Sequence, residues 1–341
     1  MEMRAKRETG GLARKAAGAG LLAALGGIGY STLFVPHSLP LPPAVSGGER
    51  RETEGQAGRL SYYVAGSGAP MLLIHSINAA GSAYEVKTIF EHYAASRRVY
   101  AVDLPGFGFS DRSDREYRMR LYVAAVHDML DVIAEDSGME PVDALALSLS
   151  SEFLARAALA RPERFRSLAL VTPTGFGQGS SALHGPPGST REIRGMKAIV
   201  SFPLWGRPLF DALSSKASIR YFLEKTWGSK EIDEGMLEYD YLTTHQPGAQ
   251  HAPYAFISGK LFSSDIRSVY EELTVPVWMP HGTRGDFGDF SEADAVAGKP
   301  NWTVQAFNTG ALPHFEAPRE FLDAYELFMM SLPRARAVVG A

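Results

Sequence analysis

A serine stands at the junction between two segments of different hydrophobic pattern. Residues 142–147 are apolar or small, which is typical of a buried strand, and residues 150–160 carry alanine and leucine at helical spacing. Because so few residues separate them, the chain must turn sharply and expose the side chain at the apex. Residues 146–150 read Ala-Leu-Ser-Leu-Ser, with small residues where a nucleophile elbow usually has glycine. We therefore predict that Ser148 is a nucleophile, the alternative being a serine that merely ends a strand.

The composition excludes several other classes of function. The chain of 341 residues is 45% apolar and 21% charged, as in globular proteins, and its net charge is −4. It has no basic block beyond the N-terminus, which argues against nucleic acid as a partner. The absence of cysteine excludes disulfides, thiolate nucleophiles and thiolate metal sites. No nucleotide, metal or flavin motif is present, so we expect no cofactor.

The N-terminal region has the pattern of a targeting segment. A basic flank (1–15) precedes twenty uncharged residues (16–35), which suffice to cross a bilayer as a helix. A signal-anchor is the favoured interpretation, followed by a cleaved secretory peptide and by a helix lying against the domain. The first two predict a membrane-anchored or exported protein on the periplasmic side. Residues 36–57 form a Pro/Gly-rich linker, and 334–341 are expected to be a tail.

From residue 58 the pattern becomes that of an α/β protein. Apolar strands alternate with helical segments, which predicts a mostly parallel, doubly wound sheet formed by 58–173 and 271–333. Residues 174–270 interrupt the alternation with aromatic helical segments and are predicted to be a helical lid insertion. The expected strands are 60–65, 71–75, 98–103, 142–147, 167–172, 275–282 and 302–307, with helices over 118–134, 150–160 and 319–330.

Several motifs in one order resemble those of the α/β-hydrolase fold over about residues 58–333. They are the strand ending Leu-Leu-Ile-His-Ser (72–76), the turn Asp-Leu-Pro-Gly-Phe-Gly-Phe-Ser (103–110), the elbow, Ala-Arg-Pro-Glu-Arg-Phe (160–165), Pro-Val-Trp-Met-Pro-His-Gly (276–282) and Leu-Pro-His-Phe-Glu-Ala-Pro (312–318). The resemblance implies a catalytic serine, acid and histidine in that order along the chain.

The implied acid and base are less regular than the serine. The acid is expected in the loop after the strand that ends in His-Gly, where Asp286 is the best match and Asp289 the substitute. The family's Gly-His-x-Pro-x-x-Glu-x-Pro pattern places the histidine at Ala311, which cannot carry a proton. His314 is the provisional base, and a capping or packing role is its alternative. The remaining candidates are His75 and His281 at strand ends, and His245 and His251 in the insertion.

The resemblance also implies an oxyanion hole made of backbone N–H groups. We expect these donors at Ser76 or Ile77 and at Leu149, with Asn78 as a further donor. The aromatic insertion predicts a lid over an apolar pocket and hence a small, hydrophobic, uncharged substrate. Most of its aromatic residues are expected in the core of the lid and the others in the pocket: Trp205, Phe210, Tyr221, Phe222, Trp227, Tyr239 and Tyr241.

Two functional hypotheses follow. The first is a serine hydrolase, esterase- or lipase-like, that cleaves an ester or related acyl bond with Ser148, His314 and Asp286. The second is a binding or membrane-tethered accessory protein that keeps the pocket and has lost the base. Lyase or peroxidase-like chemistry on the same fold is a third possibility. The sequence does not determine the oligomeric state.

Overall fold

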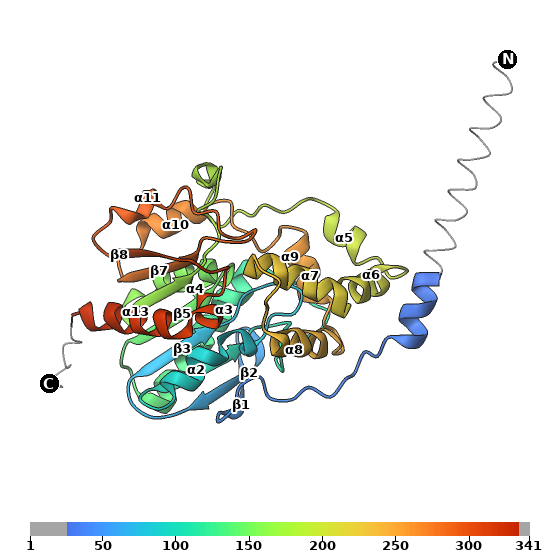
Figure 1. The fold of residues 1–341 in the computed structure, drawn as a ribbon, viewed down its shortest axis with the longest axis horizontal. Helices are drawn as coiled ribbons and strands as arrows, with labels where there is room; N and C mark the ends of the chain where they lie inside the picture. Colours follow the sequence, from blue (N-terminus) through green and yellow to red (C-terminus); the bar gives the residue numbers. More distant parts are fainter. Residues whose placement is uncertain (1–25, 334–341) are drawn as a thin grey trace, which may run out of the picture.

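A single eight-stranded sheet organises the computed structural model, which describes residues 26–333 (Figure 1). Its strand order is β1-β2-β4-β3-β5-β6-β7-β8, and every pairing is parallel except β1–β2 and β2–β4. The prediction of a mostly parallel α/β-hydrolase-type sheet is therefore confirmed. The strands are β1 (Glu49–Gly55), β2 (Gly58–Ala65), β3 (Pro70–Ile74), β4 (Arg98–Asp103), β5 (Val142–Leu147), β6 (Phe165–Val171), β7 (Val277–Gly282) and β8 (Trp302–Phe307).

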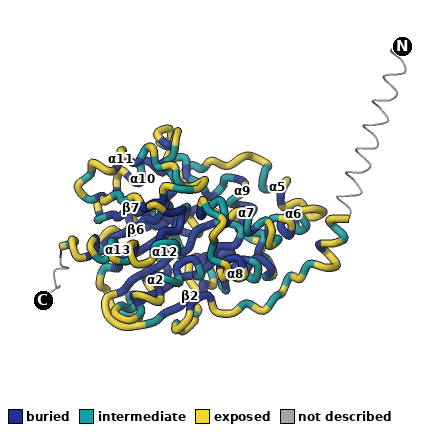
Figure 2. Tube along the Cα trace, in the orientation of Figure 1, coloured by how far each residue is buried: buried dark blue, intermediate teal, exposed yellow. Residues whose placement is uncertain are grey.

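Helices cover both faces of this sheet, and the central strands are fully buried (Figure 2). Continuous apolar strands are expected where both faces are covered. One face packs against α3 (Met119–Ser137), α4 (Ser150–Ala160) and α10 (Ile266–Glu272), and the other against α2 (Lys87–Tyr93) and α13 (Pro318–Ser331). Shorter helical segments are η1 (Ala83–Val86), η2 (Pro162–Arg164), η3 (Ser180–Ala182), α11 (Asp294–Ala297) and α12 (Pro313–Glu316).

The insertion between β6 and β7 forms the predicted helical lid at one end of the sheet (Figure 1). Its helices are α5 (Met196–Val200), α6 (Gly206–Leu213), α7 (Lys216–Trp227), α8 (Glu234–Thr244) and α9 (His251–Ile257). Two boundaries differ from the prediction. Strand β1 occupies residues assigned to the linker, because it pairs with β2 over seven residues, and α10 belongs to the core because it packs on α4.

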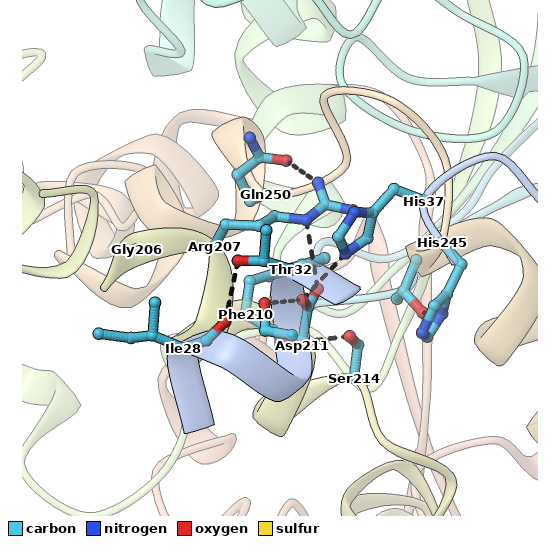
Figure 3. Close-up of polar contacts among 12 residues, drawn as sticks. Ile28, Thr32, His37, Gly206, Arg207, Phe210, Asp211, Ser214, His245 and Gln250 are labelled. Carbon is cyan, nitrogen blue, oxygen red and sulfur yellow. Dashed lines mark hydrogen bonds and ion pairs between the residues drawn. The ribbon is translucent and has the colours of Figure 1, made fainter. Parts of the chain in front are cut away.

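The N-terminal segment approaches the lid rather than the sheet. Residues 1–25, which hold half of the predicted signal-anchor (16–35), lie outside the described residues, while 26–34 form a helix beside α6. The buried Asp211 of α6 accepts hydrogen bonds from Ser31 at 2.5 Å and from His37 at 2.9 Å, and pairs with Arg207 at 3.2 Å (Figure 3). Within residues 26–333, no helix is both long and apolar enough to cross a membrane.

Candidate active site

Ser148 occupies the sharp turn that the sequence predicts between β5 and α4. Its backbone is left-handed with φ +50°, a conformation that is strained for a residue with a Cβ. The turn is held by hydrogen bonds from Ser148 N–H to Val171 O (2.9 Å) and from Ser151 N–H to Ser148 O (3.1 Å). Ser150, which stands where glycine is usual, is buried and donates its hydroxyl to His75 O at 2.6 Å. The variant elbow is thus tied directly to the end of β3.

A cavity of about 150 Å³ lies in front of Ser148, between the sheet and the lid. Its walls are mainly apolar, and none of the described residues that line it is a histidine, lysine or arginine. The lining comprises Ser76, Ile77, Asn78, Glu85, Ser148, Leu149, Thr174, Leu223, Thr226, Met236, Asp240, Phe256, Phe262, Phe287, Ala311 and Leu312. A small compound can therefore reach Ser148 without meeting a positive charge.

Two backbone N–H groups remain available for an oxyanion. Ile77 and Leu149 line the cavity, and their N–H groups engage no backbone carbonyl within the described chain. Ser76 was the alternative to Ile77, but its N–H donates to the Glu85 carboxylate at 2.7 Å. The Asn78 amide also donates to Glu85, at 2.7 Å. Of the predicted donors, the N–H groups of Ile77 and Leu149 are not engaged by a backbone carbonyl of the described chain, whereas Ser76 and Asn78 donate to the Glu85 carboxylate.

His314 does not lie in this cavity, so the structure does not bring the predicted base to Ser148. Its ring is completely buried on α12, and Nε2–H donates to Glu85 O at 2.7 Å. Burial lowers the pKa of His314 to about 4, which keeps the imidazole neutral. The physical reason for the difference is the direction of the short helix α12, which points the ring towards η1 and presents Ala311 and Leu312 to the cavity instead.

The predicted acid is also displaced from the serine. Asp286 is exposed at the surface and forms an ion pair with Lys225 at 3.4 Å, on the outside of the lid. The substitute, Asp289, shapes a turn by accepting the N–H groups of Gln178 (2.8 Å) and Ser291 (3.1 Å). Neither carboxylate lines the cavity. The two residues therefore have the turn-shaping and surface roles that acidic residues commonly take in loops.

The other histidines have structural partners. His75 is buried, donates from Nδ1 to Ser76 O (2.6 Å) and accepts the Leu104 N–H at Nε2 (2.9 Å). His281 stacks on Phe290, with ring centroids 4.1 Å apart. His245 bonds to Tyr241 O within the lid at 2.6 Å, and His251 faces Asp114. None of the four lines the cavity.

Two carboxyl groups that the sequence analysis missed do face Ser148 across the cavity. Glu85 of η1 and Asp240 of α8 are both buried, and they are the only titratable side chains among the described residues of the lining. Burial raises the pKa of both groups. For Asp240 the helical period was a usable signal, because it shares the inner face of α8 with Met236 and Thr244.

The aromatic lining also differs from the prediction. Phe210, Trp227 and Tyr239 are buried within the lid as expected, but Trp205, Tyr221 and Phe222 are exposed. None of the seven aromatic residues named from the sequence lines the cavity. The aromatic wall consists of Phe256, Phe262 and Phe287.

Comparison with known proteins agrees with this architecture. Residues 71–324 match the model of the alpha/beta hydrolase family. The chain belongs to this family. It is 29% identical to a 2-hydroxymuconate semialdehyde hydrolase of Pseudomonas sp. (strain CF600) over 42% of this chain, a match that spans about half (52%) of that relative. It is 24% identical to the enzyme of the same name from Pseudomonas putida, over 70% of this chain and 85% of the relative.

A solved structure described as a membrane phospholipase A aligns over a larger part of this alpha/beta hydrolase. The TM-score is 0.64, with 20% identity, over 95% of this chain and 97% of the other. At this identity the likeness shows the fold alone. The chain differs from the sequence pattern of the family at one position of the site. The elbow serine is present, but Ala311, which lines the cavity, stands where the motif has histidine.

Proposed function

We propose that the chain is a hydrolase that uses Ser148 to cleave an acyl bond in a small, uncharged, mainly apolar compound. The observation that carries this proposal is the strained left-handed backbone of Ser148 at the apex of the elbow. Such strain is found where a site requires it. The hydroxyl shares the cavity with the free N–H groups of Ile77 and Leu149, the arrangement that stabilises a tetrahedral oxyanion.

The proposed reaction needs a proton acceptor other than imidazole. Ser148 Oγ attacks the carbonyl carbon, and its proton passes to a carboxylate of the cavity. The leaving group takes that proton as the acyl bond breaks, and water then releases the acyl group from Ser148. Glu85 is the candidate acceptor, because three hydrogen bonds from Ser76 and Asn78 favour its ionised form.

The cavity argues for an uncharged substrate. Glu85 and Asp240 supply acidic groups, and no basic residue among those described lines the space, so a substrate carboxylate would be repelled. The two relatives are hydrolases named for a muconate semialdehyde. We infer that this chain shares their fold and reaction class with a different, uncharged substrate.

A fluorophosphonate probe tests the nucleophile directly. We expect covalent labelling of the wild-type protein, loss of labelling in Ser148→Ala, and loss in Glu85→Gln with the fold retained by circular dichroism. Hydrolysis of 4-nitrophenyl acetate and butyrate should follow the same order. Labelling that persists in Ser148→Ala would contradict the assignment of the nucleophile.

A second candidate function is binding without turnover. Ala311 faces the cavity where the histidine is expected, and the Glu85 carboxyl lies beside the loop that would hold the oxyanion. Both features disfavour acyl transfer, since a negative charge near an oxyanion raises its energy. A folded wild-type protein that reacts with neither fluorophosphonate nor ester would support this second function.

We also propose that the protein acts at a membrane surface, with the lid beside the N-terminal segment as the contacting face. Large apolar side chains are exposed on the helix 26–34 and on the adjoining part of the lid: Tyr30, Leu33, Phe34, Ile199, Phe202, Leu204, Trp205 and Leu209. Arg194 and Lys197 are interspersed on the same part of the lid. Aromatic and basic residues in this combination are typical of interfacial segments.

Vesicle flotation of the full chain tests this localisation. We expect co-flotation with phosphatidylglycerol-containing vesicles and weaker binding of the variant Leu204→Ser/Trp205→Ser. The variant Leu327→Ser/Met330→Ser removes two apolar residues of α13 that are more exposed than Leu204 and Trp205 and lie away from the lid, and it should bind like the wild type. Equal losses in the two variants would contradict the assignment of this face.

A further inference from the structure

Among the described residues, Asp240 is the one that both has a buried polar atom without a partner and lines the cavity of Ser148. It lies on the inner face of α8, which packs over η1, and only 6% of the residue is exposed. Its Oδ1 atom is buried and has no hydrogen-bond partner within residues 26–333. Several other buried atoms of the described chain also lack a partner, but they lie away from this cavity, so Asp240 is the one that a bound compound could satisfy. Asp240 lines the cavity of Ser148, where such a partner would sit.

Burial and the neighbouring charges determine whether the Asp240 carboxyl is protonated when a ligand binds. Glu85 of η1 and Asp233, which precedes α8, are the acidic groups whose charges act on Asp240. Asp233 accepts a hydrogen bond from the Tyr84 hydroxyl at 3.3 Å, and Lys87 donates to that same hydroxyl at 3.1 Å. Burial first, and then the charges of Glu85 and Asp233, raise the pKa of Asp240 well above its ordinary value. The protonated form of the Asp240 carboxyl is therefore favoured in the folded chain, and in that form the group is a hydrogen-bond donor.

Glu85 differs from Asp240 in its hydrogen bonds. Its carboxylate accepts the Ser76 N–H (2.7 Å), the Ser76 hydroxyl (3.0 Å) and the Asn78 amide (2.7 Å). Burial raises the pKa of Glu85, and these donors oppose that rise in part by stabilising the ionised form. Of the two acids, Glu85 is thus held as the acceptor, and Asp240 is left to bind what enters the cavity.

We propose that Asp240 is a ligand-binding residue that donates a hydrogen bond to an oxygen of an uncharged carbonyl compound held beside Ser148. The volume of about 150 Å³ is roughly that of a protein cavity that holds one benzene ring, so the ligand is small. The phenylalanines 256, 262 and 287 provide the apolar wall for its carbon atoms. This assignment deepens the proposed function by naming the group that recognises the substrate, but it does not require turnover at Ser148.

Three small probes of similar size separate the possible ligand chemistries. Acetophenone is an uncharged carbonyl compound, benzylamine a cation and benzoate an anion. Dissociation constants are measured by NMR titration of the full-length Ser148→Ala protein, so that no acyl chemistry interferes. We expect saturable binding of acetophenone and binding at least about tenfold weaker for both charged probes. Benzoate is repelled by the Glu85 carboxylate, and the ammonium of benzylamine finds no free acceptor, because the Glu85 oxygens already accept three hydrogen bonds and the neutral Asp240 offers a donor.

Two substitutions then isolate the hydrogen bond. Asp240→Asn keeps a donor of the same shape and should bind acetophenone within about threefold of the parent. Asp240→Leu removes the donor and should bind about five- to tenfold more weakly, the effect of one hydrogen bond. Acetophenone affinity should also fall at alkaline pH in the parent, but stay constant in Asp240→Asn. If Asp240→Leu does not fold, this comparison of pH dependence still tests the donor.

The proposal would be overturned by tighter binding of benzylamine than of acetophenone, by unchanged affinity in a folded Asp240→Leu, or by no saturable acetophenone binding. These results are independent of the fluorophosphonate experiment. Acetophenone binding with the expected dependence on Asp240, together with no labelling of Ser148, would remove the hydrolase function and leave the ligand-binding role. Labelling of Ser148 without any dependence of binding on Asp240 would support the hydrolase function and remove the ligand-binding role of Asp240.

Discussion

Substituting Ala311 by histidine should introduce an imidazole base, which the described lining of the cavity lacks. Ala311 borders the same cavity as Ser148, and its backbone is fixed by its N–H to Thr226 O (2.8 Å) and by the Thr172 hydroxyl to its carbonyl (2.8 Å). The cavity of about 150 Å³ corresponds to roughly five waters, so a five-membered ring can be accommodated. The substitution therefore adds an imidazole opposite the serine while the backbone stays in place.

The expected gain in the rate of the Ser148 reaction is that of a general base without an acid to orient it. A positioned general base contributes about 10²–10⁴ in rate, and each tenfold corresponds to about 1.36 kcal/mol. Asp286 is exposed and paired with Lys225, so no acid orients the new imidazole, and loss of that acid costs a triad up to about 10⁴. We therefore expect a modest acceleration of about ten- to hundredfold, or about 1.4–2.7 kcal/mol of transition-state stabilisation.

The assay is the second-order rate of fluorophosphonate labelling, followed across pH. In Ala311→His the rate should rise as the imidazole loses its proton near pH 6.5, the ordinary pKa of histidine. Ala311→Gln is the matched control, since it fills similar space without a titrating group. An Ala311→His protein that is folded but no faster than Ala311→Gln would refute the inference that a missing base limits Ser148.

Three further predictions concern stability and the displaced residues. Ser148→Gly should be more stable than Ser148→Ala by about 1 kcal/mol in urea unfolding, because glycine relieves the left-handed strain at φ +50°, and equal stabilities would show that the turn is not strained. The pKa of His314 is lowered to about 4, so the unfolded chain takes up its proton first as the pH falls below 6.5. Unfolding free energy should therefore drop by about 3 kcal/mol between pH 6.5 and 4, and His314→Gln should remove that part of the drop. Asp286→Asn should leave labelling of Ser148 unchanged and alter stability by less than about 1 kcal/mol, since it breaks only an exposed ion pair; a large loss of labelling would restore Asp286 to the site.

The fold could be predicted closely because its signals are local. The strands over 98–103 and 302–307 coincide with β4 and β8, since apolar runs of strand length between turns have few alternative interpretations. Strand β1 was missed because it is polar and exposed, and only its pairing with β2 identifies it. An edge strand of this kind carries no apolar pattern that a sequence could reveal.

The site was predictable only where a single turn determines it. Ser148 is positioned by its own flanking strand and helix, so local sequence suffices. The direction of the His314 ring depends on how α12 meets η1, and the position of Asp286 depends on the packing of its loop against α7. Glu85 and Asp240 lie in the same cavity because helix α8 of the lid packs against η1 in the folded chain. These positions depend on contacts between segments far apart in the sequence, and the local pattern of residues does not predict such contacts.

The strained serine and the unpartnered carboxyl belong to one cavity, and this coincidence is the strongest physical argument for function. A left-handed Ser148 costs about 1–3 kcal/mol, and a buried unpaired oxygen on Asp240 costs a similar amount. The hydrogen bonds of the elbow hold Ser148 in this conformation, whereas no described contact satisfies the Asp240 oxygen, and a ligand with a carbonyl group could engage both side chains at once. Their presence in the lining of the same small cavity is better explained by binding than by packing, whether or not the bound compound is then cleaved.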